Sequence, residues 1–320
     1  MPQHFLLSSK AKTLSLSQVL RMTDAEAYAQ FKAIRFAQNQ GKPFCPKCGC
    51  VEAYEYTTCP LFKCKACRSR FSITSGTLFH SRKLSMRDIL GAIALYANGA
   101  KGHSALQLSR DLKLAYKTSF VLLHKIREAL GDLQKGVSLS GTVEVDGCHV
   151  GGHVRPANYK ADRIDRRLKE NQSGKRRVVV VMRERDGRTV TEVFRSEDEA
   201  VPAIMQRVAE GSVIHADEAS AWDALVSRYE MKRINHGFVY SHDGACTNQA
   251  ESFFNRLCRA EAGIHHHIRR QYLSAYAAEM AWREDHRRIS NGEQYRAIVT
   301  AAAKHPVSRQ WKGYWQRRAA

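Results

Sequence analysis

The stretch TVEVDGCHVGG (Thr142–Gly152) decides the fold, because its alternating apolar and polar residues are typical of a β-strand with one face in a core. The stretch that follows it at 175–195, KRRVVVVMRERDGRTVTEVFR, predicts two more strands. They meet at Asp186-Gly187, a dipeptide that favours a tight hairpin turn. The first half of this region therefore reads as three consecutive antiparallel strands.

Helical and strand patterns alternate after the hairpin. The predicted helices span 199–210, 219–229 and 247–259, and the predicted strands span 212–217 and 232–236. The complete order is β-β-β-α-β-α-β-α, in which three antiparallel strands are followed by parallel strands that helices connect. We therefore predict an α/β fold over 140–290, with a ribonuclease-H-like mixed sheet.

Three acidic residues far apart in the sequence are expected to meet in this sheet. Asp146 lies in the first strand, Asp217 ends the fourth strand, and Glu251 is in the first turn of the helix at 247–259. Ligands of open α/β sheets bind at the carboxyl ends of strands. Carboxylates are the ligands that magnesium and manganese prefer, and two such ions support in-line phosphoryl transfer.

Asn248 is an alternative to Glu251 as the third ligand, since it lies one helical turn earlier. Its carbonyl oxygen is neutral, whereas the charge of Glu251 helps to hold divalent cations, so Glu251 is the better ligand. Asn248 also stands where a helix N-cap is expected. Glu144 shares a strand face with Asp146 and is a further, accessory candidate.

The charge balance points to a polyanionic partner. The 320 residues include 51 Lys and Arg against 31 Asp and Glu, a formal net charge of +20. Residues 155–177 hold nine basic and three acidic residues, and we interpret them as an exposed insertion that contacts DNA phosphates. No run of 18 apolar residues and no signal peptide is present, so we expect a cytoplasmic protein that does not engage a membrane.

The cysteine spacing predicts a structural zinc site. CPKC (Cys45–Cys48) and CKAC (Cys64–Cys67) are two knuckles separated by fifteen residues, as in a four-thiolate zinc ribbon. The predicted ligands are Cys45, Cys48, Cys64 and Cys67, with Cys50 and Cys59 as possible replacements for one of them. Four protein ligands leave no position for substrate, so the Zn²⁺ would be structural.

Helical patterns flank the ribbon. Thr23 and Glu26 have the spacing of a capping box on a helix that ends near Gly41, and Ser85 is expected to cap a helix that ends at Gly99. The helices at 104–114 and 116–130 are closely joined, which favours a helix-turn-helix or else an ordinary helical bundle. In the first case Tyr116, Lys117, Thr118 and Ser119 would enter the major groove of DNA.

These motifs together resemble a known family. CPKC with CKAC, FSITSGTLFHSRKLS (71–85), VEVDG with VGGHVRPAN, RRLKENQSGKRRVVVVMRER (166–185), HADEASAW (215–222) and TNQAESFF (247–254) are similar to zinc-ribbon insertion-sequence transposases of the IS-fifteen-ninety-five type, whose catalytic domain is ISXO-two-like. The resemblance runs from about Phe31 to Arg288. It implies a bacterial, nucleoid-associated DDE-type DNA transposase that cuts at element ends, joins them to target DNA and forms a homo-oligomer on DNA.

The resemblance also implies roles for individual residues. Asp146 and Asp217 take the first two catalytic positions, Glu251 or Asn248 takes the third, and a basic residue follows near Arg259. The residues that we expect to contact double-stranded DNA are Tyr116, Lys117, Thr118, Lys160, Arg166, Arg167, Lys175, Arg176 and Arg259. Two other functions remain open, a DNA-binding regulator derived from an inactive transposase and a structure-specific nuclease.

The expected organisation has five parts. They are an N-terminal helical segment (1–42), a zinc ribbon (43–80), a helix-turn-helix domain (81–135), the catalytic domain (140–290) and a basic aromatic tail (291–320).

Overall fold

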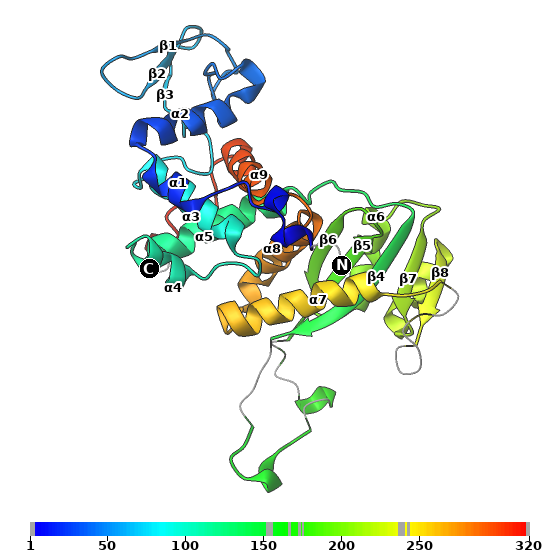
Figure 1. Cartoon of the computed structure of the whole chain (residues 1–320). Coiled ribbons are helices and arrows are strands. Elements are labelled where there is room, and N and C mark those ends of the chain that lie inside the picture. The colour runs from blue at the N-terminus through cyan, green and yellow to red at the C-terminus, as the bar shows by residue number, and fades with distance from the viewer. Residues whose placement is uncertain are drawn as a thin grey trace. The chain divides into compact units, whose positions relative to one another are not determined.

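The computed structural model describes residues 4–151, 156–165, 168–171, 174, 176–235, 241 and 244–317. The chain divides into two compact units (Figure 1). The first, here called the ribbon-and-helix unit, comprises Met1–Leu133 together with His286–Ala320. The second, the sheet unit, comprises Gln134–Asp285. The segment that we expected as a tail is therefore grouped with the N-terminal part of the chain.

The ribbon-and-helix unit contains several helices and a small sheet. Its helices are α1 (Leu16–Arg21), α2 (Asp24–Arg35), α3 (Met86–Asn98), α4 (Ala105–Asp111), α5 (Tyr116–Asp132), α9 (Asn291–Lys304) and α10 (Tyr314–Arg317). Thr23 and Glu26 form the expected capping box, and Ser85 caps α3. The helix after Thr23 was predicted to reach Gly41 and ends at Arg35 instead. A short 3₁₀ turn at Ala37–Asn39 follows, and Gln40 adopts a left-handed conformation that stops the helix.

The small sheet carries the cysteine knuckles. Its strands β1 (Ala53–Glu55), β2 (Phe62–Cys64) and β3 (Arg70–Phe71) pair antiparallel in the order β1-β2-β3. Phe62 is fully buried, and its ring meets the rings of Phe36 and Phe71. This aromatic contact packs the ribbon onto the residues that follow α2.

The sheet unit contains five strands in the order β6-β5-β4-β7-β8. They are β4 (Thr142–Val150), β5 (Arg177–Glu184), β6 (Thr189–Phe194), β7 (Val213–Asp217) and β8 (Glu230–Ile234). The pairs β4–β5 and β5–β6 are antiparallel, whereas β4–β7 and β7–β8 are parallel. This is the predicted mixed sheet. Asp186 turns the hairpin with a φ of 58°, a left-handed conformation that Asp tolerates.

Helices cover both faces of the sheet (Figure 1). The helix α6 (Val201–Arg207) and the 3₁₀ helix Ser220–Ser227 bury one face, in a core that includes Val143, Val180 and Trp222. The helices α7 (Asn248–Ala260) and α8 (Leu273–Asp285) bury the other face against residues such as Val179 and Val181. Because side chains alternate along a strand and Val143 and Val145 face α6, Glu144 and Asp146 are directed toward α7.

The remaining short helices lie in connections. They are 3₁₀ turns at Phe5–Leu7, Ser9–Ala11, Lys160–Asp162, Lys169–Asn171, Asp198–Ala200 and Arg270–Tyr272, and a π-helical turn at Glu261–His265. Among the described residues, no helix has the length and apolar character needed to cross a membrane.

Candidate active site and metal centre

Asp146 and Asp217 lie on neighbouring parallel strands. The β4–β7 register pairs Glu144 with His215, and two further residues along each strand reach Asp146 and Asp217. Parallel strands are separated by about 4.8 Å, and residues two apart share a face. The pairing therefore places Asp146 and Asp217 on neighbouring strands and on the same face of the sheet, with Asp217 at the carboxyl end of β7.

The Asp217 carboxylate is held from one side. Its Oδ1 accepts hydrogen bonds from the indole Nε1–H of Trp222 at 2.8 Å and from the backbone N–H of Ala219 at 3.2 Å. Trp222 is fully buried, so the carboxylate is tied to the core of the sheet unit. Asp146 is held by the backbone N–H of Gly147, which donates to its Oδ1 at 2.7 Å.

Glu197 is a fourth carboxylate that the sequence analysis did not identify. It precedes α6 and packs against the backbone of β4 at Gly147, where an added Cβ would lie 2.5 Å from Glu197 Oε1. Gly147 is therefore required for this close approach. His149 Nε2 lies 3.9 Å from the same oxygen. The run of acids at 197–199 was visible in the sequence, but nothing in its spacing indicated proximity to Asp146.

The electrostatics of Asp146 link it to Asp217, Glu197 and Glu251, and these four carboxylates are here called the acidic cluster. Burial is the main reason that the pKa of Asp146 is raised to about 7, and the negative charges of Asp217, Glu197 and Glu251 raise it further. The Gly147 hydrogen bond acts in the opposite direction. Burial and Asp217 also raise the pKa of Glu197. Crowded carboxylates of this kind are a donor set that suits a hard divalent cation.

Glu251 and Asn248 differ in their surroundings. Asn248 was expected as the N-cap of its helix, but the N-cap is Thr247, whose carbonyl accepts the Glu251 N–H at 2.9 Å. Asn248 is instead the first helical residue, and its side chain is exposed. Glu251 is half-buried and acts electrostatically on Asp146. Glu251 is therefore near enough to Asp146 to affect its charge.

Glu144 anchors α7. Its fully buried carboxylate accepts the backbone N–H of Gln249 at 2.8 Å and that of Ala250 at 3.1 Å. An acidic group at this position satisfies unpaired N–H groups and favours the helix dipole. Arg185 Nε completes the arrangement at 3.0 Å from Glu144 Oε1. Glu144 therefore positions the helix that carries Glu251, in place of the accessory ligand role that we considered.

A second set of contacts holds the segment before α7. Arg185 Nη2 donates to the carbonyl oxygen of Cys246 at 3.2 Å and lies 3.1 Å from His215 Nδ1. The Cys246 N–H donates to His215 Nδ1 at 3.2 Å. These bonds connect β7 with the start of α7, so Asp217 and Glu251 are supported by one polar network.

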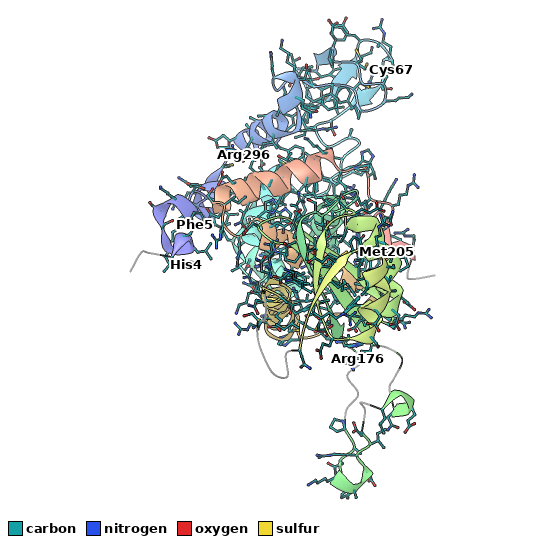
Figure 2. All side chains as sticks on the ribbon, turned by 90° about the vertical axis from the view of Figure 1, so that its right-hand side faces the viewer. His4, Phe5, Cys67, Arg176, Met205 and Arg296 are labelled. Atoms are coloured by element: carbon teal, nitrogen blue, oxygen red, sulfur yellow. The ribbon has the colours of Figure 1, made fainter. Side chains whose placement is uncertain are left out.

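The four predicted cysteines form the other centre. Their sulfur atoms all lie within 4.8 Å of one another. The distance is 3.6 Å both from Cys45 Sγ to Cys67 Sγ and from Cys48 Sγ to Cys64 Sγ. A tetrahedral ion with Zn–S bonds of about 2.3 Å separates its ligands by about 3.8 Å, so the cluster fits Zn²⁺. Cys50 and Cys59 are outside the cluster. Cys67 is labelled in Figure 2.

The acidic cluster is more open than the cysteine cluster. Over the described part of the chain, the cysteines are the only group of three or more His, Cys, Asp or Glu side chains gathered closely enough for a metal ion. The acidic residues are near enough to interact electrostatically, but their ligand atoms are not gathered around one point.

The expected DNA-contacting residues lie in different parts of the structure. Tyr116, Lys117 and Thr118 are exposed at the start of α5, whereas Ser119 is fully buried and cannot contact a base. The other described candidates, Lys160, Arg176 and Arg259, are exposed, and Arg176 directly precedes β5 (Figure 2). The predicted contacts of Arg166, Arg167 and Lys175 fall outside the described residues.

Comparison with known proteins gives two family matches. Residues 138–285 match the ISXO2-like transposase domain, and residues 22–70 match the transposase zinc-ribbon domain. No curated protein matches the chain. A solved structure described as the crystal structure of the Mos1 strand transfer complex aligns with 68% of this chain and 78% of its own, at 13% identity. The TM-score of this alignment is 0.25. On the two family matches, the chain belongs to the zinc-ribbon insertion-sequence transposases with an ISXO2-like transposase domain.

Proposed function

We propose that this protein catalyses metal-dependent strand cleavage at insertion-sequence ends and transfers the freed strand into target DNA. The observation that carries the proposal is the parallel pairing of β4 with β7, which makes the strands of Asp146 and Asp217 neighbours, together with the electrostatic effect of Asp217 on Asp146. Two-metal sites for phosphoryl transfer are built from carboxylates of neighbouring elements, and divalent ions would draw these side chains together. The sheet unit would thus act as a ribonuclease-H-like catalytic domain.

In this proposal Asp146, Asp217 and Glu251 hold magnesium or manganese. Glu251 is preferred to Asn248 because it is half-buried and raises the pKa of Asp146, whereas Asn248 is exposed. When bound, the divalent ions would activate the attacking oxygen and stabilise the leaving oxygen. Trp222 and Glu144 fix the geometry, the first by orienting Asp217 and the second by anchoring α7.

The ribbon-and-helix unit would bind the element ends. We propose that Cys45, Cys48, Cys64 and Cys67 hold a structural Zn²⁺ and that α4 and α5 act as a helix-turn-helix. Four residues, Leu112–Ala115, connect these helices, and the exposed side chains of Tyr116, Lys117 and Thr118 begin the second one. Phosphate contacts would come from the insertion at 155–177 and from Arg259.

The function is tested by strand cleavage on DNA that carries the sequences flanking the gene, with magnesium present. The variants Asp146→Asn and Asp217→Asn are expected to lose cleavage by more than about 100-fold, beyond what loss of an outer-shell partner costs. They should bind the same DNA as wild type does. The matched control is Asp186→Asn, which changes an exposed acid in the hairpin turn and should cleave normally.

The products separate this proposal from its alternatives. A covalently joined product identifies a transposase. Cleavage without joining would indicate a nuclease. Binding without cleavage in the wild-type protein would indicate a regulator, and cleavage by Asp146→Asn would refute the assignment of the site.

A further inference from the structure

A cavity of about 670 Å³ is lined by residues of the ribbon-and-helix unit. Three segments line it. They are the loop Phe79–Leu84 that follows the ribbon, the first half of α5, and the residues around α10. Its volume is in the range of pockets that hold a small ligand.

The charged side chains that line the cavity are all positive. Arg82, Lys83, Lys117 and Lys125 all line the cavity, and none of its described lining residues is Asp or Glu. Lys125 is partly buried, and burial lowers the pKa of its ammonium group. Glu128, which does not line the cavity, acts on Lys125 from the same helix. A cavity whose charged lining residues are all cations favours an anionic ligand.

Aromatic rings form part of the cavity wall, here called the aromatic wall. Tyr314 and Trp315 both line the cavity. Two contacts with Lys117 hold the Trp315 indole. Its Nε1–H donates to the carbonyl oxygen of Lys117 at 3.4 Å, and the Lys117 ammonium lies 5.3 Å from the centre of its ring. A ring held in this way is ready to stack against a planar group without further loss of side-chain freedom.

Two polar features in this region have no side-chain partner. The Nδ1 atom of His80, a lining residue, is buried without a hydrogen bond. The N-cap of the 17-residue helix α5 is Ala115, which provides no side-chain acceptor for the first N–H groups. The start of a helix next to Lys117 favours a phosphate group.

We propose that this cavity binds one unpaired nucleotide of DNA, with its base stacked on the aromatic wall and its phosphate held by the lysines and the start of α5. Aromatic stacking accepts any base, and the cations supply affinity for the backbone. The proposal rests on the proposed function, because it assumes a DNA substrate. It adds a site that distinguishes unpaired from paired DNA.

The test compares three DNAs of one element-end sequence with the full-length, zinc-loaded protein and no added magnesium. The first is a fully paired duplex, the second has a one-nucleotide single-stranded overhang, and the third has one unpaired thymine in its centre. Fluorescence anisotropy gives the dissociation constants. We expect one of the unpaired forms to bind at least about fivefold more tightly than the paired duplex, as one stacked base provides. The preferred form distinguishes a strand end from an extruded base.

Two variants assign the preference to the cavity. Trp315→Ala removes part of the aromatic wall, and Val121→Phe fills the cavity from α5 without a change in charge. Both should bind the three DNAs with equal affinity. The matched control is Tyr54→Ala, which removes an exposed aromatic ring of the ribbon that does not line the cavity and should keep the preference.

Several results would overturn the proposal. Equal affinities of the wild-type protein for the three DNAs would do so, as would a preference that survives in both Trp315→Ala and Val121→Phe. A protein that cleaves element ends but shows no preference contradicts this inference alone. A protein that binds none of the three DNAs contradicts both this inference and the proposed function.

Discussion

The carboxylate of Glu144 accepts the backbone N–H of Gln249 at 2.8 Å, and this bond ties the strand that carries Asp146 to the helix that carries Glu251. Arg185 neutralises the same carboxylate from the side at 3.0 Å. The site thus depends on a buried residue that would not itself contact substrate.

Replacing Glu144 by Gln should destabilise the sheet unit by about 2–3 kcal/mol, because Arg185 and the first N–H groups of α7 lose a charged partner. The effect is smaller than for a fully buried pair, since Arg185 is partly exposed. Urea unfolding measures it. The control is Glu192→Gln in strand β6, which breaks a half-exposed ion pair with Arg207 of α6. It should lower the free energy of unfolding by less than about 1 kcal/mol. Equal effects of the two variants would contradict the anchoring role.

Replacing Glu197 by Gln should raise the magnesium concentration for half-maximal cleavage by about tenfold, the lower end of the effect of an outer-shell partner. The physical reason is the loss of one of the negative charges around Asp146, which should also lower the pKa of Asp146. Cleavage assays over a magnesium series measure the change. The exposed neighbour Glu199 provides the control Glu199→Gln, and an unchanged magnesium dependence of Glu197→Gln would exclude a role for this residue.

Zinc content should distinguish the clustered cysteines from the others. Cys64→Ser removes one of four gathered sulfur atoms and should lose the ion and the folded ribbon. Cys59 lies outside the cluster, so the Cys59→Ser protein should retain about one zinc per chain, as four-thiolate sites do. Atomic emission spectroscopy of the purified proteins measures both. Full zinc content in Cys64→Ser would show that another ligand set is used.

The capping box of α9 should make the ribbon-and-helix unit sensitive to acid. The side-chain and backbone groups of Ser290 lower the pKa of Glu293 below its usual 4.5. The stabilisation is therefore present above about pH 4.5 and is lost as the pH falls through the folded-state pKa. Wild type should unfold at higher urea than Glu293→Gln at pH 7, and the difference should be smaller at pH 3, because Glu293 begins to be protonated below pH 4.5.

An exposed acid provides the comparison for this pH effect. Glu230→Gln changes a surface residue of β8 and should unfold like wild type at both pH values. If the difference between wild type and Glu293→Gln were the same at pH 3 and pH 7, the capping box would not be its cause.

The sequence by itself determined the features that depend on local pattern. The CxxC knuckles each direct two sulfur atoms within one turn, so their spacing identified all four clustered cysteines. Strand alternation and the Asp186-Gly187 turn predicted the hairpin. The order of elements also predicted that the strands of Asp146 and Asp217 are parallel neighbours.

Only the tertiary structure decided which distant side chains meet. Periodicity says which face of its own element a residue occupies, but not which other element packs there. Glu197 approaches Asp146 because Gly147 leaves room for it, and Glu144 faces the start of α7 because that helix crosses β4. Ser119 is buried by the packing of α5, although its neighbours are exposed. Such contacts arise between segments far apart in the chain, where packing and close approach, and not local spacing, set the distance.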